Sequence, residues 1–216
     1  MSKVNIRGAN ANNGNTVPIP QHGIGDVIVI FAYRSNSATP PSTPVAGGTV
    51  PSWAGITANS GGSFNSFQLS YCVATADDHT SGTWTNANGM IAVVLDQAKS
   101  DMPIGGYAVG AQSVGTSLVA PAVTLVNNDG SSALLHFFGL GDNTNAVSSW
   151  APAPTGYTQQ AAQGYTSAKV AVCLDSKNDT TSDGAVTQVA GASAWYRTLS
   201  LEIVAAENDG AFFMFF

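Results

Sequence analysis

The sequence has few charged residues. Asp, Glu, Lys and Arg make up 9% of its 216 residues, against roughly 25% in an ordinary soluble domain. Glu occurs only at positions 202 and 207, and Lys and Arg together number seven, so the residues that usually fill exposed helix faces are nearly absent. The composition therefore favours strands and loops. A surface built mainly from uncharged side chains suits permanent neighbours better than free diffusion.

Other absences exclude whole classes of protein. The net charge of −6 and the scattered basic residues oppose binding to phosphate backbones, so we expect no nucleic-acid partner. No run approaches the ~18 apolar residues of a membrane span, and the opening "MSKVNIRGAN" lacks the apolar region of a secretory signal. We therefore expect no membrane span and synthesis in a cytoplasm.

Apolar runs bounded by turn signals predict the strands. "VIVIFAY" at residues 27–33 and "MIAVVL" at 90–95 are typical of buried strands. In residues 66–75, Phe67, Leu69, Tyr71 and Val73 alternate with polar side chains and with Cys72, which indicates a half-buried strand.

The second half of the chain repeats the first in outline. "ALLHFFGL" corresponds to "VIVIFAY", "SAKVAVCLDS" to "SFQLSYCVAT" and "RTLSLEIVAA" to "GMIAVVLDQA", and Cys173 follows Cys72 by 101 residues. A repeat of this length is too long for a solenoid. It predicts an all-β, antiparallel β-sandwich, jelly-roll-like, with two pseudo-symmetric halves.

Three parts are expected along the chain. Residues 1–22 are rich in Asn and show no periodicity, so we interpret them as an extended N-terminal arm lying on another molecule. Residues 23–206 form the single β-sandwich domain, although a boundary at 127–132 is an alternative. Residues 207–216 form an aromatic C-terminal anchor.

The order of features in the first half resembles a β-sandwich family of tailed bacteriophages. "GDVIVIFAYRSNSATPPSTP", "SWAGITA" and "LSYCVATADDHTSGTWTNANGMIAVVL" are similar to the strands and turns of virion proteins described as tail, fibre-associated or capsid-decoration components. The resemblance covers about residues 24–205. It implies a β-sandwich and a virion location after synthesis in the host cytoplasm, and it supplies no catalytic residues.

Residues that could carry chemistry are few. Asp77, Asp78 and His79 are adjacent and therefore diverge, which is typical of a solvated turn. The three aspartates of "LDSKNDTTSDG" (Asp175, Asp179 and Asp183) lack the spacing of an EF-hand, so we predict no metal site, with a loose cation site in these loops left open.

We also predict no cofactor and no enzymatic activity. The sequence contains no G-x-S-x-G motif, and His136 within "LLHFF" has no evident nucleophile partner. Cys72 and Cys173 occupy matching positions, and whether they pair is left open.

Two tryptophans are candidates for glycan contact. Trp53 and Trp150 stand beside Ser/Pro-rich loops, where aromatic rings can stack on sugars. The other two tryptophans, Trp84 and Trp195, lie next to strands, and we expect them to pack into the core or under a loop.

The sequence ends in "GAFFMFF", which would be an aggregation hazard in water. Burying five such side chains contributes about 1.5 to 3 kcal/mol each before ordering costs. We therefore predict a partner-binding segment made of Phe212, Phe213, Met214, Phe215 and Phe216; folding back over its own sandwich edge is the alternative.

Together these features predict a non-enzymatic structural protein of a phage virion. Its expected partners are other virion proteins and further copies of itself, with a trimer as one candidate homo-oligomer. The alternative is a carbohydrate-binding adhesin or receptor-binding module that contacts a host surface glycan.

Overall fold

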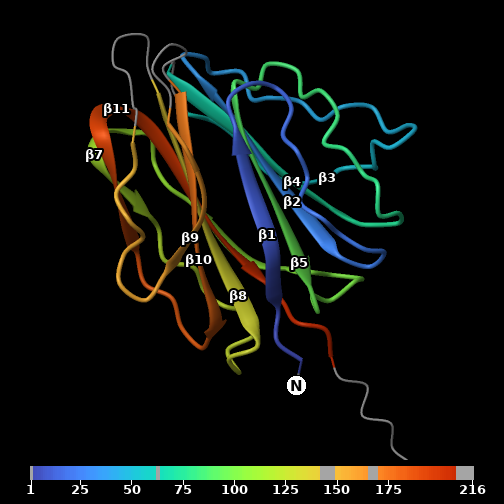
Figure 1. The fold of residues 1–216 in the computed structure, drawn as a ribbon. Coiled ribbons are helices and arrows are strands. Elements are labelled where there is room, and N and C mark those ends of the chain that lie inside the picture. The colour runs from blue at the N-terminus through green and yellow to red at the C-terminus, as the bar shows by residue number, and fades with distance from the viewer. Residues whose placement is uncertain (1, 62–63, 142–148, 165–169, 208–216) are drawn as a thin grey trace, which may run out of the picture.

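The computed structural model describes residues 2–61, 64–141, 149–164 and 170–207. The described chain contains eleven strands and no helix. The strands form two antiparallel sheets that face each other (Figure 1). The prediction of an all-β, antiparallel sandwich is confirmed.

Each sheet is built from one half of the chain. Sheet 1 has the order β1-β5-β2-β4-β3, with β1 (Asn5–Asn12), β2 (Val27–Ser35), β3 (Ala54–Gly61), β4 (Asn65–Val73) and β5 (Gly89–Asp96). Sheet 2 has the order β6-β11-β8-β10-β9, and β7 also pairs with β11. Its strands are β6 (Ile104–Val109), β7 (Ser113–Ala120), β8 (Ser132–Gly141), β9 (Thr158–Gln163), β10 (Val170–Thr180) and β11 (Val186–Ile203).

The two sheets share one order of strands. Strands β5, β2, β4 and β3 of sheet 1 correspond to β11, β8, β10 and β9 of sheet 2, so the pseudo-symmetric halves inferred from the sequence are confirmed. The jelly-roll-like expectation is narrowed to a two-sheet sandwich, because the described strands pass from one sheet to the other only at the β5–β6 link. The alternative boundary at 127–132 falls between β7 and β8, which belong to the same sheet.

Alternation along the strands fills the space between the sheets. Val27, Val29 and Phe31 of β2 face inward, and the Phe31 ring lies 5.2 Å from that of Phe137 on β8. The alternation predicted for β4 is confirmed, because Phe67 belongs to this inner core while Cys72 faces outward. Burial of these apolar side chains is the main favourable term in folding.

Both outer faces are also covered. On sheet 1, Ile28 and Met90 pack with Trp84 from the β4–β5 connection. On sheet 2, Phe138 packs beneath Leu118 of β7. A strand buried on both faces reads as a continuous apolar run rather than an alternating one, which is why β2, β5 and β8 are so apolar.

The first 22 residues differ from their expected position. Residues 5–12 form β1, which pairs with β5 at the edge of sheet 1, and the following segment crosses the outer face of the same sheet with Val17 buried. In the structure this segment therefore lies on its own sandwich rather than on another molecule. Alternate small side chains, Ala9 and Ala11, pack against the inner core, and such small residues leave only a weak sequence pattern.

Candidate functional site

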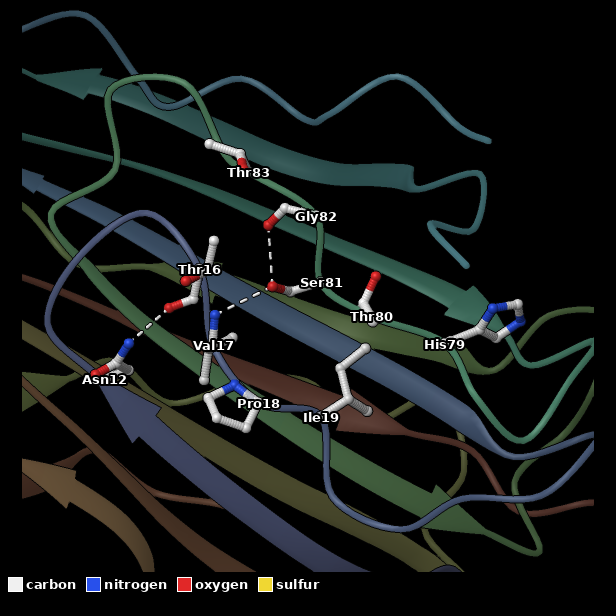
Figure 2. Close-up of a pocket in the computed structure, with 10 residues that line it drawn as sticks. All are labelled: Asn12, Thr16, Val17, Pro18, Ile19, His79, Thr80, Ser81, Gly82 and Thr83. Carbon is white, nitrogen blue, oxygen red and sulfur yellow. Dashed lines mark hydrogen bonds between the residues drawn. The ribbon is translucent and has the colours of Figure 1, made fainter. Parts of the chain in front are cut away.

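An open groove lies between the segment after β1 and the β4–β5 connection (Figure 2). Its volume is about 540 Å³. One wall is formed by residues 16–19, the other by residues 79–83, and Asn12 lies at one end. Among the described residues, the lining contains hydroxyl, amide and imidazole groups and no carboxylate, Lys or Arg.

Hydrogen bonds fix the two walls to each other. The Val17 N–H donates to Ser81 Oγ (3.1 Å), and the Trp84 N–H donates to the Asn15 carbonyl (2.8 Å). The indole of Trp84 is fully buried and donates through Nε1 to the Ser81 carbonyl (3.0 Å). The groove is therefore preformed, because its walls rest on a buried aromatic anchor.

Two stacked histidines hold the end of the groove near residue 79. The rings of His22 and His79 lie 5.8 Å apart and are nearly parallel. His22 Nε2 accepts the backbone N–H of His79 (3.1 Å), and His79 Nε2 accepts the backbone N–H of Thr75 (3.1 Å). The two Nδ1 atoms face the carbonyls of Pro20 and Thr49. This arrangement assigns both rings to the neutral tautomer with the proton on Nδ1.

A charged cluster fastens β1 beside this histidine pair. Arg7 Nε lies 3.1 Å from a carboxylate oxygen of Asp26 and 3.1 Å from one of Asp96. Asp26 also accepts the backbone N–H of Gly23 (2.7 Å). Asp26, which the sequence places at a strand entry, thus joins β1 to the start of β2.

The two candidate glycan tryptophans lie on the outer-face clusters. Trp53 is 9% exposed and packs against Trp84, at 5.9 Å between ring centroids. Trp150 is partly buried against the outer face of sheet 2, and its Nε1 faces the Gln163 carbonyl (3.3 Å). The two rings occupy equivalent positions in the two halves, and neither lines the groove.

The acidic loops are separated by the fold. Asp77 and Asp78 are exposed, whereas Asp175 is buried. Asp183 Oδ1 accepts the hydroxyl of Tyr157 (3.0 Å). Among the residues that the structure describes, no three His, Cys, Asp or Glu side chains gather as metal ligands would.

A row of buried polar side chains lies on sheet 2, and no local sequence pattern predicts it. Asp175, His136 and Ser200 lie side by side on β10, β8 and β11. His136 Nδ1 is 2.9 Å from Ser200 Oγ, and His136 Nε2 is 3.7 Å from Asp183. Sequence reasoning found no nucleophile partner for His136 because the three strands are far apart in the chain and only the register joins them.

The geometry of this row is that of a structural network. Ser200 donates its hydroxyl proton to the Pro121 carbonyl (2.6 Å), so His136 donates to Ser200 rather than accepting its proton. Both side chains are fully buried, and a nucleophile needs a base that takes its proton and room for a substrate. The row instead fastens the segment after β7 onto sheet 2.

Burial shifts the proton affinities in this row. It lowers the pKa of His136 to about 4, helped by the positive charge of Lys177. Burial also raises the pKa of Asp175 to about 6 and raises the pKa of Asp183. Taking a charge out of water disfavours its ionised form, so the imidazole and the carboxyls shift in opposite directions.

The cysteines lie on opposite outer faces. Cys72 belongs to the cluster outside sheet 1 and Cys173 to the cluster outside sheet 2, so both sheets and the inner core separate them. Both are free and buried. Burial raises the pKa of Cys72 to about 12.

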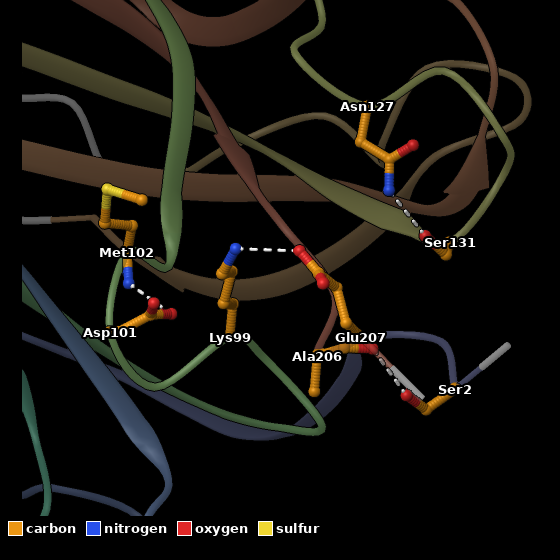
Figure 3. Close-up of polar contacts among 8 residues, drawn as sticks. All are labelled: Ser2, Lys99, Asp101, Met102, Asn127, Ser131, Ala206 and Glu207. Atoms are coloured by element: carbon orange, nitrogen blue, oxygen red, sulfur yellow. Dashed lines mark hydrogen bonds and ion pairs between the residues drawn. The ribbon is translucent and has the colours of Figure 1, made fainter. Parts of the chain in front are cut away.

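The predicted partner-binding segment, Phe212 to Phe216, lies outside the described residues. The structure does fix the point from which it continues (Figure 3). The Ala206 carbonyl accepts the Ser2 hydroxyl (2.9 Å), and the Ala206 N–H donates to the Gln97 carbonyl (2.8 Å). Lys99 pairs with Glu207 at 2.9 Å.

Comparison of the chain with protein-family models, curated proteins and solved structures finds no match. In the described part of the chain, no helix has the length and apolar character needed to cross a membrane.

Proposed function

We propose that the protein is a non-enzymatic structural component of a phage virion that assembles with neighbouring subunits through residues 208–216. The observation that carries this proposal is a run of five large apolar residues at positions 212–216, separated by four residues from a fixed exit point at Ala206 and Glu207. Its partners are further copies of the chain or other virion proteins.

Two further features support the proposal. The order of sequence features between residues 24 and 205 resembles that of tailed-phage virion sandwiches, and the low charge content of 9% suits a surface covered by permanent neighbours. Burial of an apolar segment of this size supplies free energy that offsets the cost of joining two subunits.

Removal of residues 208–216 tests the proposal in assembling particles. We expect the shortened chain to fold, because its sandwich is complete by residue 207, and to be lost from purified particles. A matched variant with Phe212, Phe213, Met214, Phe215 and Phe216 all replaced by Ser keeps the length and removes the apolar area. Undiminished incorporation of either variant would contradict the proposal.

The groove favours a second function, that of a carbohydrate-binding module. Its lining of hydroxyls with Pro18 and Ile19, and its lack of charged side chains, suit a neutral hydroxyl-rich ligand better than an ionic one. On a glycan array we expect binding that is lost in Thr83→Glu, which lines the groove, and kept in Thr116→Glu on β7. Equal binding by both variants would show that the groove is not the glycan-binding site.

A further inference from the structure

The two flanks of the sandwich differ. At one flank β1 lies against β9, and Asn13 Nδ2 donates to the Gly164 carbonyl (3.2 Å). Moving away from this flank, β5 of sheet 1 contacts β10 of sheet 2, β2 contacts β8 and β4 contacts β11. This leaves β3 and β6 as the last two strands on the other side. We call this second side the open flank.

Partly exposed apolar side chains line the open flank. Those packed against the inner core are Ile56, Tyr71 and Val73 from sheet 1 and Ile104 and Val109 from sheet 2. Tyr107 of β6 is 48% exposed and pairs with the inward-facing Leu201, so its ring lies on the side of β6 that faces sheet 1. Phe64 stacks on Trp195 at 4.4 Å between centroids, which joins the two sheets at one end of this flank.

The strand edges here carry no charged side chain, and the pairing of each edge strand contains one β-bulge. In the described chain β3 pairs only with β4, and β6 pairs only with β11. Exposed edges are often guarded by charged residues or by proline within the strand, yet β3 and β6 contain neither. The open flank can therefore accept a further strand without placing a charge against it.

We propose that the open flank receives residues 208–216 of a neighbouring copy as an added strand. This inference rests on the proposed function and names the surface that the segment would bind. Nine extended residues span about 30 Å, and the eight residues of β3 span about 26 Å. The bulky apolar side chains of the segment match the partly exposed apolar side chains of the flank.

Strand direction favours a neighbour's segment over the chain's own. The Val204 N–H donates to the Pro103 carbonyl (2.9 Å), so β11 ends where β6 begins. The antiparallel pairings also make β3 run away from this end, because β5 finishes there beside Ala205 and Ala206. The chain's own segment would therefore enter the open flank parallel to both β3 and β6.

A neighbour's segment can enter in the opposite sense. It would then run antiparallel to β3 and β6, and antiparallel pairing is slightly more stable per residue than parallel pairing. Exchange between copies thus buries the apolar side chains of the segment and supplies hydrogen-bond partners to the exposed strand edge.

Disulfide trapping tests this placement, because the two native cysteines are buried. Copies carrying Met214→Cys are mixed with mass-tagged copies carrying Tyr107→Cys and oxidised. We expect a disulfide between the two kinds of copy and none with Thr158→Cys, an exposed control on β9 at the other flank. A chain carrying both Met214→Cys and Tyr107→Cys that closes its disulfide within a monomer would overturn the inference.

A second measurement separates failure of this inference from failure of the proposed function. We expect Tyr107→Lys to raise the dissociation constant for self-association at least about tenfold, with Thr158→Lys leaving it unchanged. Association that survives Tyr107→Lys but is lost on deleting residues 208–216 would overturn the open-flank assignment and leave the proposed function standing. Association that survives the deletion would overturn both.

Discussion

Single buried polar residues tie the covering segments to sheet 2. The carboxylate of Glu202, which is fully buried on β11, accepts four hydrogen bonds. They come from the backbone N–H groups of Gly106 (3.0 Å), Val126 (2.6 Å) and Asn127 (3.0 Å) and from Ser132 Oγ (2.8 Å). A buried carboxylate is stable only when its oxygens are satisfied in this way.

Glu202→Gln should lower the free energy of unfolding by about 2 to 4 kcal/mol, because the new amide group would face backbone donors instead of accepting from them. Urea unfolding measures the change. Glu207→Gln is the matched control, since Glu207 is exposed and pairs with Lys99 at the surface; its effect should stay within about 0.5 kcal/mol. Equal effects at the two positions would contradict the assigned role of Glu202.

Asp175 and His136 should change the stability of the protein in opposite directions as the pH falls. The pKa of Asp175 is raised from 3.8 to about 6, so its contribution to stability is full below about pH 4 and is lost as the pH rises through 6. The pKa of His136 is lowered from 6.5 to about 4, so its contribution is full above pH 6.5 and is lost as the pH falls through 4. The two trends offset each other in the wild-type chain.

Asp175→Asn should therefore reveal the loss of stability at low pH that His136 causes. As the pH rises from 4 to 6, we expect the stability of the variant to increase relative to that of the wild type by about 1 to 3 kcal/mol. Urea midpoints across this range measure the difference. Identical pH profiles for the two proteins would show that Asp175 does not titrate as described.

Some residue-level features could be read from the sequence and others could not. The inward positions of Phe67 and Leu69 follow from alternation alone. The row of Asp175, His136 and Ser200 depends on the register between three strands, which a local pattern does not specify. The burial of Trp53 depends on contact with Trp84 from another loop, so its position beside a loop was not informative.

At the scale of elements, the segment at residues 13–22 covers the outer face of sheet 1. Its hydrogen bonds to the β4–β5 connection are made at Asn15, at Val17 and at His22, whose Nε2 accepts the His79 N–H. Loss of this acceptor leaves a partly buried donor without its partner, which is costly.

His22→Ala should destabilise the protein by about 1 to 3 kcal/mol and speed amide exchange in residues 13–22 more than elsewhere. Gln21→Ala, at the exposed neighbouring position, is the control for a change in the same segment. Exchange mass spectrometry checks both. Uniform acceleration across all strands would indicate global destabilisation instead of local release.

Strands with a strong apolar pattern were predictable, and β1 was not. Strands β2, β5 and β8 consist of long apolar runs because both of their faces are buried. Strand β1, "NIRGANAN", is an edge strand whose inward residues are mostly small. Its pairing with β5 arises from tertiary contacts and from the Arg7 ion pairs, which a local propensity cannot indicate.

At the scale of the whole molecule, two equivalent sheets hold the cysteines apart. We expect no reaction of either thiol with Ellman's reagent in the folded state, because burial raises the pKa of both thiols. Two thiols per chain should titrate after unfolding without reductant. A count below two, restored by reductant, would reveal a disulfide that this arrangement does not allow within one chain.

We propose that the chain is a subunit that associates through residues 208–216. Sedimentation equilibrium over rising protein concentration, with the full chain and the chain lacking these residues, tests it most directly. The account predicts a concentration-dependent oligomer for the full chain and a folded monomer for the shortened one. A full chain that stays monomeric at high concentration, with Phe212 to Phe216 protected inside its own fold, would contradict it.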